Sequence, residues 1–505
     1  MFNEFKLAAG TPVYLQVKNY ILWLITKGAL QEGERLPSTR ELAGLLGVSR
    51  GSVITAYESL QDEGFVHAVT GRGNFVAGIS GTGGAALEPW HMDWSERMNH
   101  QARIAVELDH MKRKQPVLSA EREIISFTSI APDEQLFDLD NVKRAFLDRM
   151  AVEGRVLLNY GYARGYKPLI NYLMKYMERK GVNLAGKEML ITSGFTEGLD
   201  ILLSSLRGVE GAESVAGSIR VLCENPTHHT AIKNLRRHGF AITGIPMQAD
   251  GLDLEALEQA LQEQTYDCAY LVPSYHNPTG IVTSAEKRLA LLQLLGRYHV
   301  PVIEDGFNEE LRYSGAHVAP LIAMAGHGNG VVYLGSFSKV LFPGIRIGWV
   351  LADRELIDVL ESVKRARSIH TSTLDQSLLY QYLHNGHLEK YVKKARTEYK
   401  RKYELARACC EEFVPDARLA GNGGLHLFLE FRDDFDTWEL LEACAAQGVI
   451  FTPGDMFFID GGGRHTLRLG ISRVKDEDIT KGIRLIGKTA AKLLANKPSG
   501  GTPMY

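Results

Sequence analysis

Two patterns of hydrophobic and polar positions divide the chain. In its first part, apolar residues recur every three or four positions, as Tyr14, Val17, Ile21 and Leu24 do, and this spacing predicts short amphipathic helices. From residue 126 to about residue 494, short apolar runs such as "SIRVLCENP", "CAYLVPS" and "VPVIED" alternate with amphipathic segments. That alternation predicts an α/β domain with a mainly parallel sheet.

The first part predicts three helices and a β-hairpin. In "PSTRELAGLLGV", Ser38 precedes Glu41 by three residues, which is the spacing of a capping box at a helix start. The next helix, in "VSRGSVITAYESLQDEG", has Val53, Tyr57 and Leu60 on one face. The stretch "FVHAVTGRGNFVAG" then predicts two strands around a Gly-Arg-Gly turn. This order of elements makes a winged helix-turn-helix.

The polar side of the third predicted helix carries groups that suit DNA. Arg50 stands at the helix start among small polar residues, where it can enter a major groove, and Arg72 at the hairpin tip can reach the DNA backbone or minor groove. Net charge alone does not show whether this segment binds DNA, because residues 1–80 contain seven Lys/Arg and seven Asp/Glu, which cancel. The alternative is a small helical interaction module with an incidental arginine.

The stretch "LPSTRELAGLLGVSRGSVITAYESLQDEGF", followed by "GRGNFV", closely resembles the GntR-type winged helix. The resemblance implies that residues 1–76 bind double-stranded DNA at an operator. Matched position by position, the DNA-contacting residues are Arg40, Ser49, Arg50, Gly51, Ser52, Thr70, Gly71 and Arg72.

Composition narrows the class of protein. With 505 residues, 45% hydrophobic and 23% charged, the chain is expected to be soluble and to form two or three domains, and its net charge of −3 points to no anionic partner. The apolar run "YILWLI" is far too short for a membrane span, and no signal peptide pattern precedes it, so we expect a cytoplasmic protein without membrane contact. Five cysteines without metal-type spacing predict core thiols and no metal site.

The predicted domains are separated by a segment of different composition. Residues 78–88, "GISGTGGAALE", are rich in Gly and Ala, as in a flexible joint. We therefore predict a DNA-binding domain over 1–76, a flexible linker over 77–125, and a larger domain over 126–494. A small C-terminal subdomain is expected from about residue 385 to residue 494.

Polar turns follow four predicted strands of the larger domain, and ligands gather at such carboxyl ends in open α/β sheets. In "LITSGFTEGLDILL", the backbone amides around Phe195 and Thr196 can face an anion. The turn "VPSYHNPTG" offers the side chain of Asn277. "VPVIEDGFNEE" ends a buried strand on Glu304 and Asp305, and a buried carboxylate needs a cationic partner such as a protonated pyridine nitrogen. Each turn alone has an ordinary structural explanation, but their order and separations favour one site.

The fourth turn, "GSFSKVLFPGIRIG", supplies an amine beside a phosphate clamp. Lys339 can form an imine, while Ser336, Ser338 and Arg346 can hold a phosphate. Together, these motifs make residues 126–494 resemble the class I, fold-type I aminotransferases that depend on pyridoxal 5'-phosphate.

The resemblance assigns roles to individual residues. Lys339 forms the Schiff base with pyridoxal phosphate, and Arg468, in "HTLRLGIS", takes a carboxylate of the substrate or effector. Tyr160 crosses the subunit interface of a homodimer. The other cofactor-binding residues implied are Phe195, Thr196, His228, Asn277, Asp305, Ser336, Ser338 and Arg346.

Two positions depart from the family pattern. His228 stands where the family has an aromatic ring that stacks on the cofactor, and Phe307 replaces a tyrosine that donates to the phenolic oxygen of the cofactor. Both changes weigh against efficient transamination. His426, in "GGLHLFL", fits a small domain that closes over the site, and a structural histidine is the alternative.

A GntR-type DNA-binding domain joined to an aminotransferase-like domain is the architecture of the MocR/GabR regulators, which the chain resembles end to end. The resemblance implies a transcriptional regulator that senses an amino compound or pyridoxal phosphate through an aldimine at Lys339. One alternative is an active aminotransferase of an amino acid with an accessory DNA-binding domain. The other, a purely structural or protein-interaction role, is disfavoured by the intact cofactor set.

Overall fold

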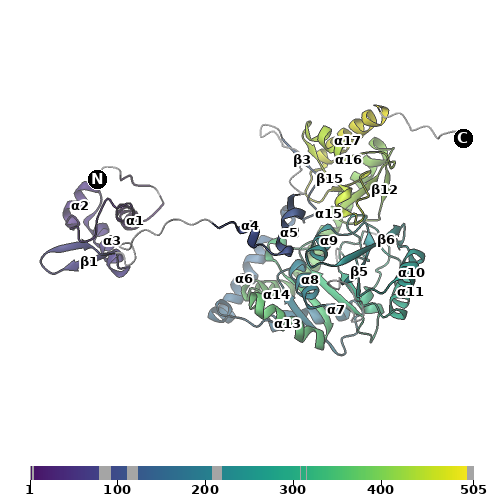
Figure 1. Cartoon of the computed structure of the whole chain (residues 1–505), viewed down its shortest axis with the longest axis horizontal. Coiled ribbons are helices and arrows are strands. Elements are labelled where there is room, and N and C mark those ends of the chain that lie inside the picture. The colour runs from purple at the N-terminus through teal and green to yellow at the C-terminus, as the bar shows by residue number, and fades with distance from the viewer. Residues whose placement is uncertain are drawn as a thin grey trace. The chain divides into compact units, whose positions relative to one another are not determined.

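The computed structural model describes residues 2, 5–8, 10–78, 92–110, 123–206, 219–306, 309–313 and 315–496. The chain divides into two compact units, Met1–Arg97 and Met98–Tyr505, whose elements are labelled in Figure 1. Within the described ranges, none of the helices combines the length and apolar character that a membrane crossing requires.

The first unit is the predicted winged helix. Its elements are α1 (Val13–Thr26), α2 (Thr39–Leu46), α3 (Arg50–Asp62), β1 (Val66–Val69) and β2 (Gly73–Val76), and the two strands pair antiparallel. The predicted capping box forms, since Ser38 Oγ accepts from the Glu41 amide and the Glu41 carboxylate accepts from the Ser38 amide. One apolar core joins the three helices and the hairpin, and it includes Val17, Ile21, Val53, Tyr57 and Val76.

The second unit is built on an eight-stranded sheet. The strand order is β4 (Lys187–Thr192), β11 (Gly348–Asp353), β10 (Val331–Ser336), β9 (Val302–Asp305), β8 (Cys268–Leu271), β5 (Arg220–Asn225), β6 (Ala241–Gln248) and β7 (Gly251–Leu252). Strands β10, β9, β8, β5 and β6 run parallel, whereas β11 and β7 are antiparallel to their neighbours. The parallel strands bring their carboxyl ends, and the polar turns that follow them, to one edge of the sheet.

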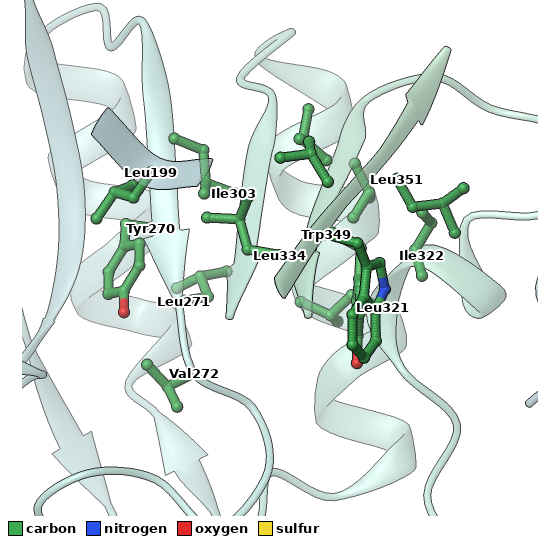
Figure 2. Packing of buried hydrophobic residues seen from close by; sticks show 14 of the residues in the cluster. Leu199, Tyr270, Leu271, Val272, Ile303, Leu321, Ile322, Leu334, Trp349 and Leu351 are labelled. Atoms are coloured by element: carbon green, nitrogen blue, oxygen red, sulfur yellow. The ribbon is translucent and has the colours of Figure 1, made fainter. Parts of the chain in front are cut away.

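Helices pack around this sheet (Figure 1). They are α6 (Leu139–Glu153), α7 (Lys167–Arg179), α8 (Phe195–Ser205), α9 (His229–Arg237), α10 (Leu254–Glu263), α11 (Ala285–Arg297), α12 (Leu321–Met324), α13 (Arg354–Ser368) and α14 (Thr373–His384), with the short turns η3 (Glu134–Leu136), η4 (Gly154–Leu158) and η5 (Pro343–Ile345). Figure 2 shows the core between the layers, where Tyr270, Ile303, Leu334 and Trp349 come from neighbouring strands. A Cβ at Gly335 would lie 2.0 Å from the Trp349 ring, so glycine there lets the indole pack against the strand.

A small C-terminal subdomain has its own antiparallel sheet, in the order β12 (Arg418–Ala420), β13 (His426–Glu430), β16 (Thr466–Gly470) and β15 (Thr452–Pro453). Its helical elements are α15 (His387–Phe413), α16 (Thr437–Ala445), η6 (Gly454–Phe457) and α17 (Asp476–Asn496). Strand β3 (Ile125–Ser126) pairs in parallel with β14 (Val449–Ile450), and Phe127 lies in the core of this subdomain. Residues near 125 therefore also belong to the small subdomain.

Two helices lie within residues 77–125, the segment predicted as a linker. They are α4 (Trp94–Arg97) and α5 (His100–His110). Figure 1 shows α5 beside α9, and Lys233 Nζ of α9 lies 2.9 Å from Asp109 Oδ1 of α5. Helix α5 is thus part of the second unit, while residues 79–91 and 111–122 of the segment lie outside the described ranges.

Candidate functional site

An anion cradle forms where β4 and β10 end. Helix α8 begins directly after Gly194, so its first amides, including those of Phe195 and Thr196, point out of the helix toward the sheet edge. Arg346 crosses this helix start and donates to Ser193 O at 3.3 Å and to Ser338 Oγ at 3.4 Å.

Two further features fix this cradle. Ser336 Oγ donates to Ser338 Oγ at 3.0 Å. Gly194 has φ 84°, and a Cβ there would lie 2.6 Å from Arg346 Nη2, so only glycine leaves room for the guanidinium. The predicted residues Phe195, Thr196, Ser336, Ser338 and Arg346 are therefore brought together around a space that suits a phosphate.

A buried carboxylate lies on the neighbouring strand. Asp305 ends β9 and is 4% exposed. Tyr270 Oη donates to its Oδ2 at 2.6 Å, and His228 Nδ1 lies 3.6 Å from the same oxygen. The His228 ring is also tilted against that of Phe195, with centroids 5.7 Å apart. Asp305 thus presents a buried, oriented carboxyl group that suits a protonated ring nitrogen as its partner.

Tyr270 is a site residue that the sequence reasoning missed. It lies in β8, in the stretch "CAYL", and pairs with Ile303 of β9, two residues before Asp305. A polar aromatic side chain near the carboxyl end of a buried strand was the available signal.

Lys339 lies in the turn after β10 and carries the reactive amine of the predicted site. Burial and, after it, the nearby charges of Arg468, Arg346 and Arg473 together lower the pKa of Lys339 to about 8, while the charge of Asp305 acts in the opposite direction. A sizeable fraction of Lys339 is therefore neutral near pH 7.5, as a nucleophilic amine requires.

Arg468 connects the two subdomains at this site. It projects from β16 of the small subdomain and donates through Nη1 to Asn277 Oδ1, at 2.8 Å, in the turn after β8. Its Nη2 donates to Thr128 O at 3.3 Å, and its guanidinium lies 4.8 Å from the centroid of the Phe457 ring. Burial lowers the pKa of Arg468 to about 9. Asn277 Nδ2 is buried and has no hydrogen-bond partner among the described residues, so one donor remains available to a ligand.

Tyr160 is not brought into the site of its own chain. It follows η4, is 80% exposed, and meets the His370 ring edge-on at a centroid distance of 6.0 Å.

His426 is buried in β13, where burial and the charge of Arg468 lower the pKa of His426 to about 3, so its ring is neutral. Phe307 lies outside the described residues.

The first unit presents the predicted DNA-contacting residues on the start of α3 and on the hairpin turn. Ser49 Oγ caps α3 by accepting from the Ser52 amide at 3.1 Å, and Arg50 Nε donates to Thr39 Oγ1 at 3.3 Å, which ties α3 to α2. Of this set, only Ser52 is half-buried. The others are exposed: Arg40, Ser49, Arg50, Gly51, Thr70, Gly71 and Arg72.

Comparison with known proteins matches both units. Residues 123–486 match the family "Aminotransferase class I and II", and residues 13–76 match "Bacterial regulatory proteins, gntR family". The 2-aminoadipate transaminase of Thermus thermophilus is 31% identical over 74% of this chain and 91% of that protein. The HTH-type transcriptional regulator YdfD of Bacillus subtilis is 26% identical over 96% of this chain and 98% of that protein.

Solved structures show the same fold for the larger domain. The α-aminoadipate aminotransferase LysN of Thermus thermophilus, in complex with N-(5'-phosphopyridoxyl)-L-leucine, is 30% identical. It superposes with a TM-score of 0.72 over 80% of this chain and all of that chain. A multiple substrate aminotransferase of Thermococcus profundus gives a TM-score of 0.73 at 25% identity.

Members of this aminotransferase family depend on pyridoxal phosphate, and the described residues fit that cofactor. The cradle at Gly194 and Arg346 suits its phosphate, Asp305 suits its ring nitrogen, and Lys339 supplies the amine. The chain therefore belongs to the aminotransferase class I and II family, and it joins that domain to a gntR-family helix-turn-helix domain in the MocR/GabR arrangement.

Proposed function

We propose that this chain is a transcriptional regulator that binds an operator and responds to a small amino compound or to pyridoxal phosphate. The observation that carries the proposal is the extent of the similarity. Relatives named as transcriptional regulators match 96% of the chain, whereas relatives named as aminotransferases match 73% and 74%. The match thus includes the DNA-binding unit in the relatives named as regulators, so this unit is not an accessory of one protein.

The effector receptor consists of Lys339 and Arg468. Bound at Lys339, pyridoxal phosphate supplies an electrophilic carbon that reacts reversibly with primary amines. The lowered pKa of Lys339 keeps part of its amine neutral, which both cofactor attachment and its exchange require. Arg468 can take the carboxylate of an amino acid through two parallel hydrogen bonds. Amino acids are therefore the favoured effectors over simple amines.

Effector binding would change the contact between the subdomains. Arg468 Nη1 holds Asn277 Oδ1 at 2.8 Å, and a ligand carboxylate on the same guanidinium competes for that donor. When the hydrogen bond from Arg468 to Asn277 is replaced by one to the ligand, the small subdomain can change its position relative to the large sheet. In a dimer that reads two half-sites, a changed spacing of the DNA-binding domains alters operator affinity.

A homodimer is part of the proposal. Several apolar side chains between residues 139 and 162, on α6, on η4 and in the segment that follows, are more than 60% exposed: Leu139, Leu147, Val152, Val156, Leu158, Tyr160 and Tyr162. Monomeric proteins rarely expose so much apolar surface in one place, and a second copy of the chain would cover it. The exposed Tyr160 is then free to reach the site of the partner, as the family resemblance implies.

The residues assigned to DNA contact and the cytoplasmic location follow from the same proposal. The exposed start of α3, with Arg50, suits a major groove, and Arg72 on the wing suits the backbone or minor groove. A protein that regulates transcription by binding an operator acts in the compartment that holds the DNA, so we place it in the cytoplasm.

The experiment is a footprint of the full-length protein on the DNA upstream of its own gene, with and without pyridoxal phosphate and candidate amino acids. A protected region whose extent or affinity changes with one of these compounds supports the proposal. No protection under any condition would contradict it.

An active aminotransferase is the second candidate, supported by the lowered pKa of Lys339 and by the 31% identity to a transaminase. His228 weighs against it, because an imidazole covers less of the cofactor ring than a phenyl group does. Steady-state assays of amino donors with 2-oxoglutarate separate the two candidates, since sustained multiple turnover would favour the enzyme.

A further inference from the structure

One cavity of the second unit shares no lining residue with the cofactor set. Its volume is about 350 Å³, and α5, α9, α16 and the residues around η6 form its walls. The apolar lining comes from Leu108, Ile232, Trp438, Leu441 and Phe451. A cavity of this size and character is large enough for a small organic molecule.

The charged groups of the cavity indicate what it would hold. Lys233 is paired with Asp109 at 2.9 Å, and Arg464 with Asp436 at 2.6 Å. Arg236 donates to Ile459 O at 3.0 Å, and it forms no ion pair within the part of the chain that the structure describes.

Asp455, the acidic residue of the lining, is only partly satisfied. Its Oδ2 accepts from Trp438 Nε1 at 2.8 Å, whereas its Oδ1 is buried and has no hydrogen-bond partner among the described residues, so it can accept from a ligand that carries a donor on its body. An apolar chamber that includes one arginine without a counter-ion complements a ligand with a carboxylate at one end and an apolar body at the other.

We propose that this cavity binds a small carboxylic acid with an aromatic body, at a site separate from Lys339. The aromatic body would pack on Trp438, Phe451 and the aliphatic residues, while the carboxylate would pair with Arg236. Burial of such a ring supplies most of the affinity, and the ion pair supplies orientation and selectivity for acids.

The position of the cavity connects it to the effector site and to the start of the second unit. Phe457, in η6, lies under the Arg468 guanidinium at 4.8 Å and meets the His229 ring at 5.7 Å, and His229 also lines the cavity. On the other side, Leu108 belongs to α5, the first helix of this unit. A ligand here would therefore contact residues next to Arg468 as well as the helix that follows the first unit in the sequence.

The test is calorimetric titration of the full-length holoprotein with 3-phenylpropionate. Two variants address the cavity. Arg236→Gln removes the charge but keeps an amide that can donate to Ile459 O, and Met456→Trp fills the space from the lining. Arg354→Gln is the matched control, since Arg354 is an exposed arginine on α13 that pairs with Glu188 at 3.1 Å. Thermal unfolding checks that each variant is folded.

We expect 3-phenylpropionate to bind saturably to the wild-type chain. Arg236→Gln should weaken this binding at least ~10-fold, equivalent to about 1.4 kcal/mol, and Met456→Trp should abolish it. Arg354→Gln and Lys339→Ala should bind as the wild type does, and the latter separates this site from the proposed effector receptor. Absence of binding up to about 10 mM, which corresponds to less than ~3 kcal/mol, would overturn the proposal. Binding that survives Arg236→Gln, or that is lost in Lys339→Ala, would overturn it as well.

Discussion

Replacing Arg468 with glutamine should raise the pKa of Lys339. After burial, the charge of Arg468 is the largest cause of the lowered pKa, ahead of Arg346 and Arg473. Burial lowers the pKa of Arg468 only to about 9, so the guanidinium is still mostly charged at pH 7.5. The variant removes that charge and keeps an amide that can face Asn277. Arg468→Lys, which retains a positive charge, is the matched control.

The magnitude follows from the pKa values. With a pKa of about 8, in place of the ordinary 10.5, Lys339 is neutral to about 24% at pH 7.5, against about 0.1% for an unperturbed lysine. If the variant raises the pKa by about one unit, the neutral fraction at pH 7.5 falls to about 3%, which is a loss of about eightfold. Only the neutral amine attacks a carbonyl carbon, so the rate of cofactor capture should fall by the same factor.

The assay is stopped-flow absorbance of pyridoxal phosphate capture by the apoprotein, measured across a pH series. The wild-type rate should rise with pH through a midpoint near the pKa of Lys339, about 8. The midpoint of Arg468→Gln should lie higher, with that of Arg468→Lys between them. A glutamine variant whose midpoint equals or falls below that of the wild type would refute the electrostatic reasoning.

Three further predictions concern other parts of the chain. Gly194→Ala should release pyridoxal phosphate faster during dialysis and lose about 1 kcal/mol of stability, because φ is 84° and the Cβ would lie 2.6 Å from Arg346 Nη2; unchanged retention would contradict the cradle. Arg50→Ala should weaken operator binding by about 1–3 kcal/mol in a mobility-shift titration, and equal binding would remove Arg50 from the interface. Val156→Asp, at a side chain that is 70% exposed, should shift the protein from dimer to monomer in sedimentation while its far-UV circular dichroism stays that of the folded chain; a dimer that persists would contradict the proposed interface.

The elements that the sequence predicted well depend on neighbours in the chain. The Ser38–Glu41 capping box spans three residues, and the structure forms it as predicted. The glycine before α8 and the serines around Lys339 act within single turns after a strand. Parallel strands place such turns at one edge, so a fold-class prediction sufficed to expect that they lie together.

The features that the sequence did not reveal depend on contacts between distant segments. Arg468 and Asn277 are separated by 191 positions, and their bond requires the small subdomain to pack in one particular way. The strand Ile125–Ser126 is too short to show a periodic pattern, and its partner at Val449–Ile450 cannot be inferred from local propensity. Helix α5 shows no strong amphipathic pattern in the sequence, and its place beside α9 depends on packing and on the Lys233–Asp109 ion pair.

The central claim is that an amino compound bound at Lys339 changes DNA binding, and operator affinity measured with and without effector tests it most directly. The fluorescence anisotropy of labelled operator DNA should give a Kd that changes with effector for the wild type. Lys339→Ala should bind the operator with a Kd that no longer changes, because the covalent attachment is lost. A Lys339→Ala protein whose Kd still responds to the effector as the wild type does would contradict the account.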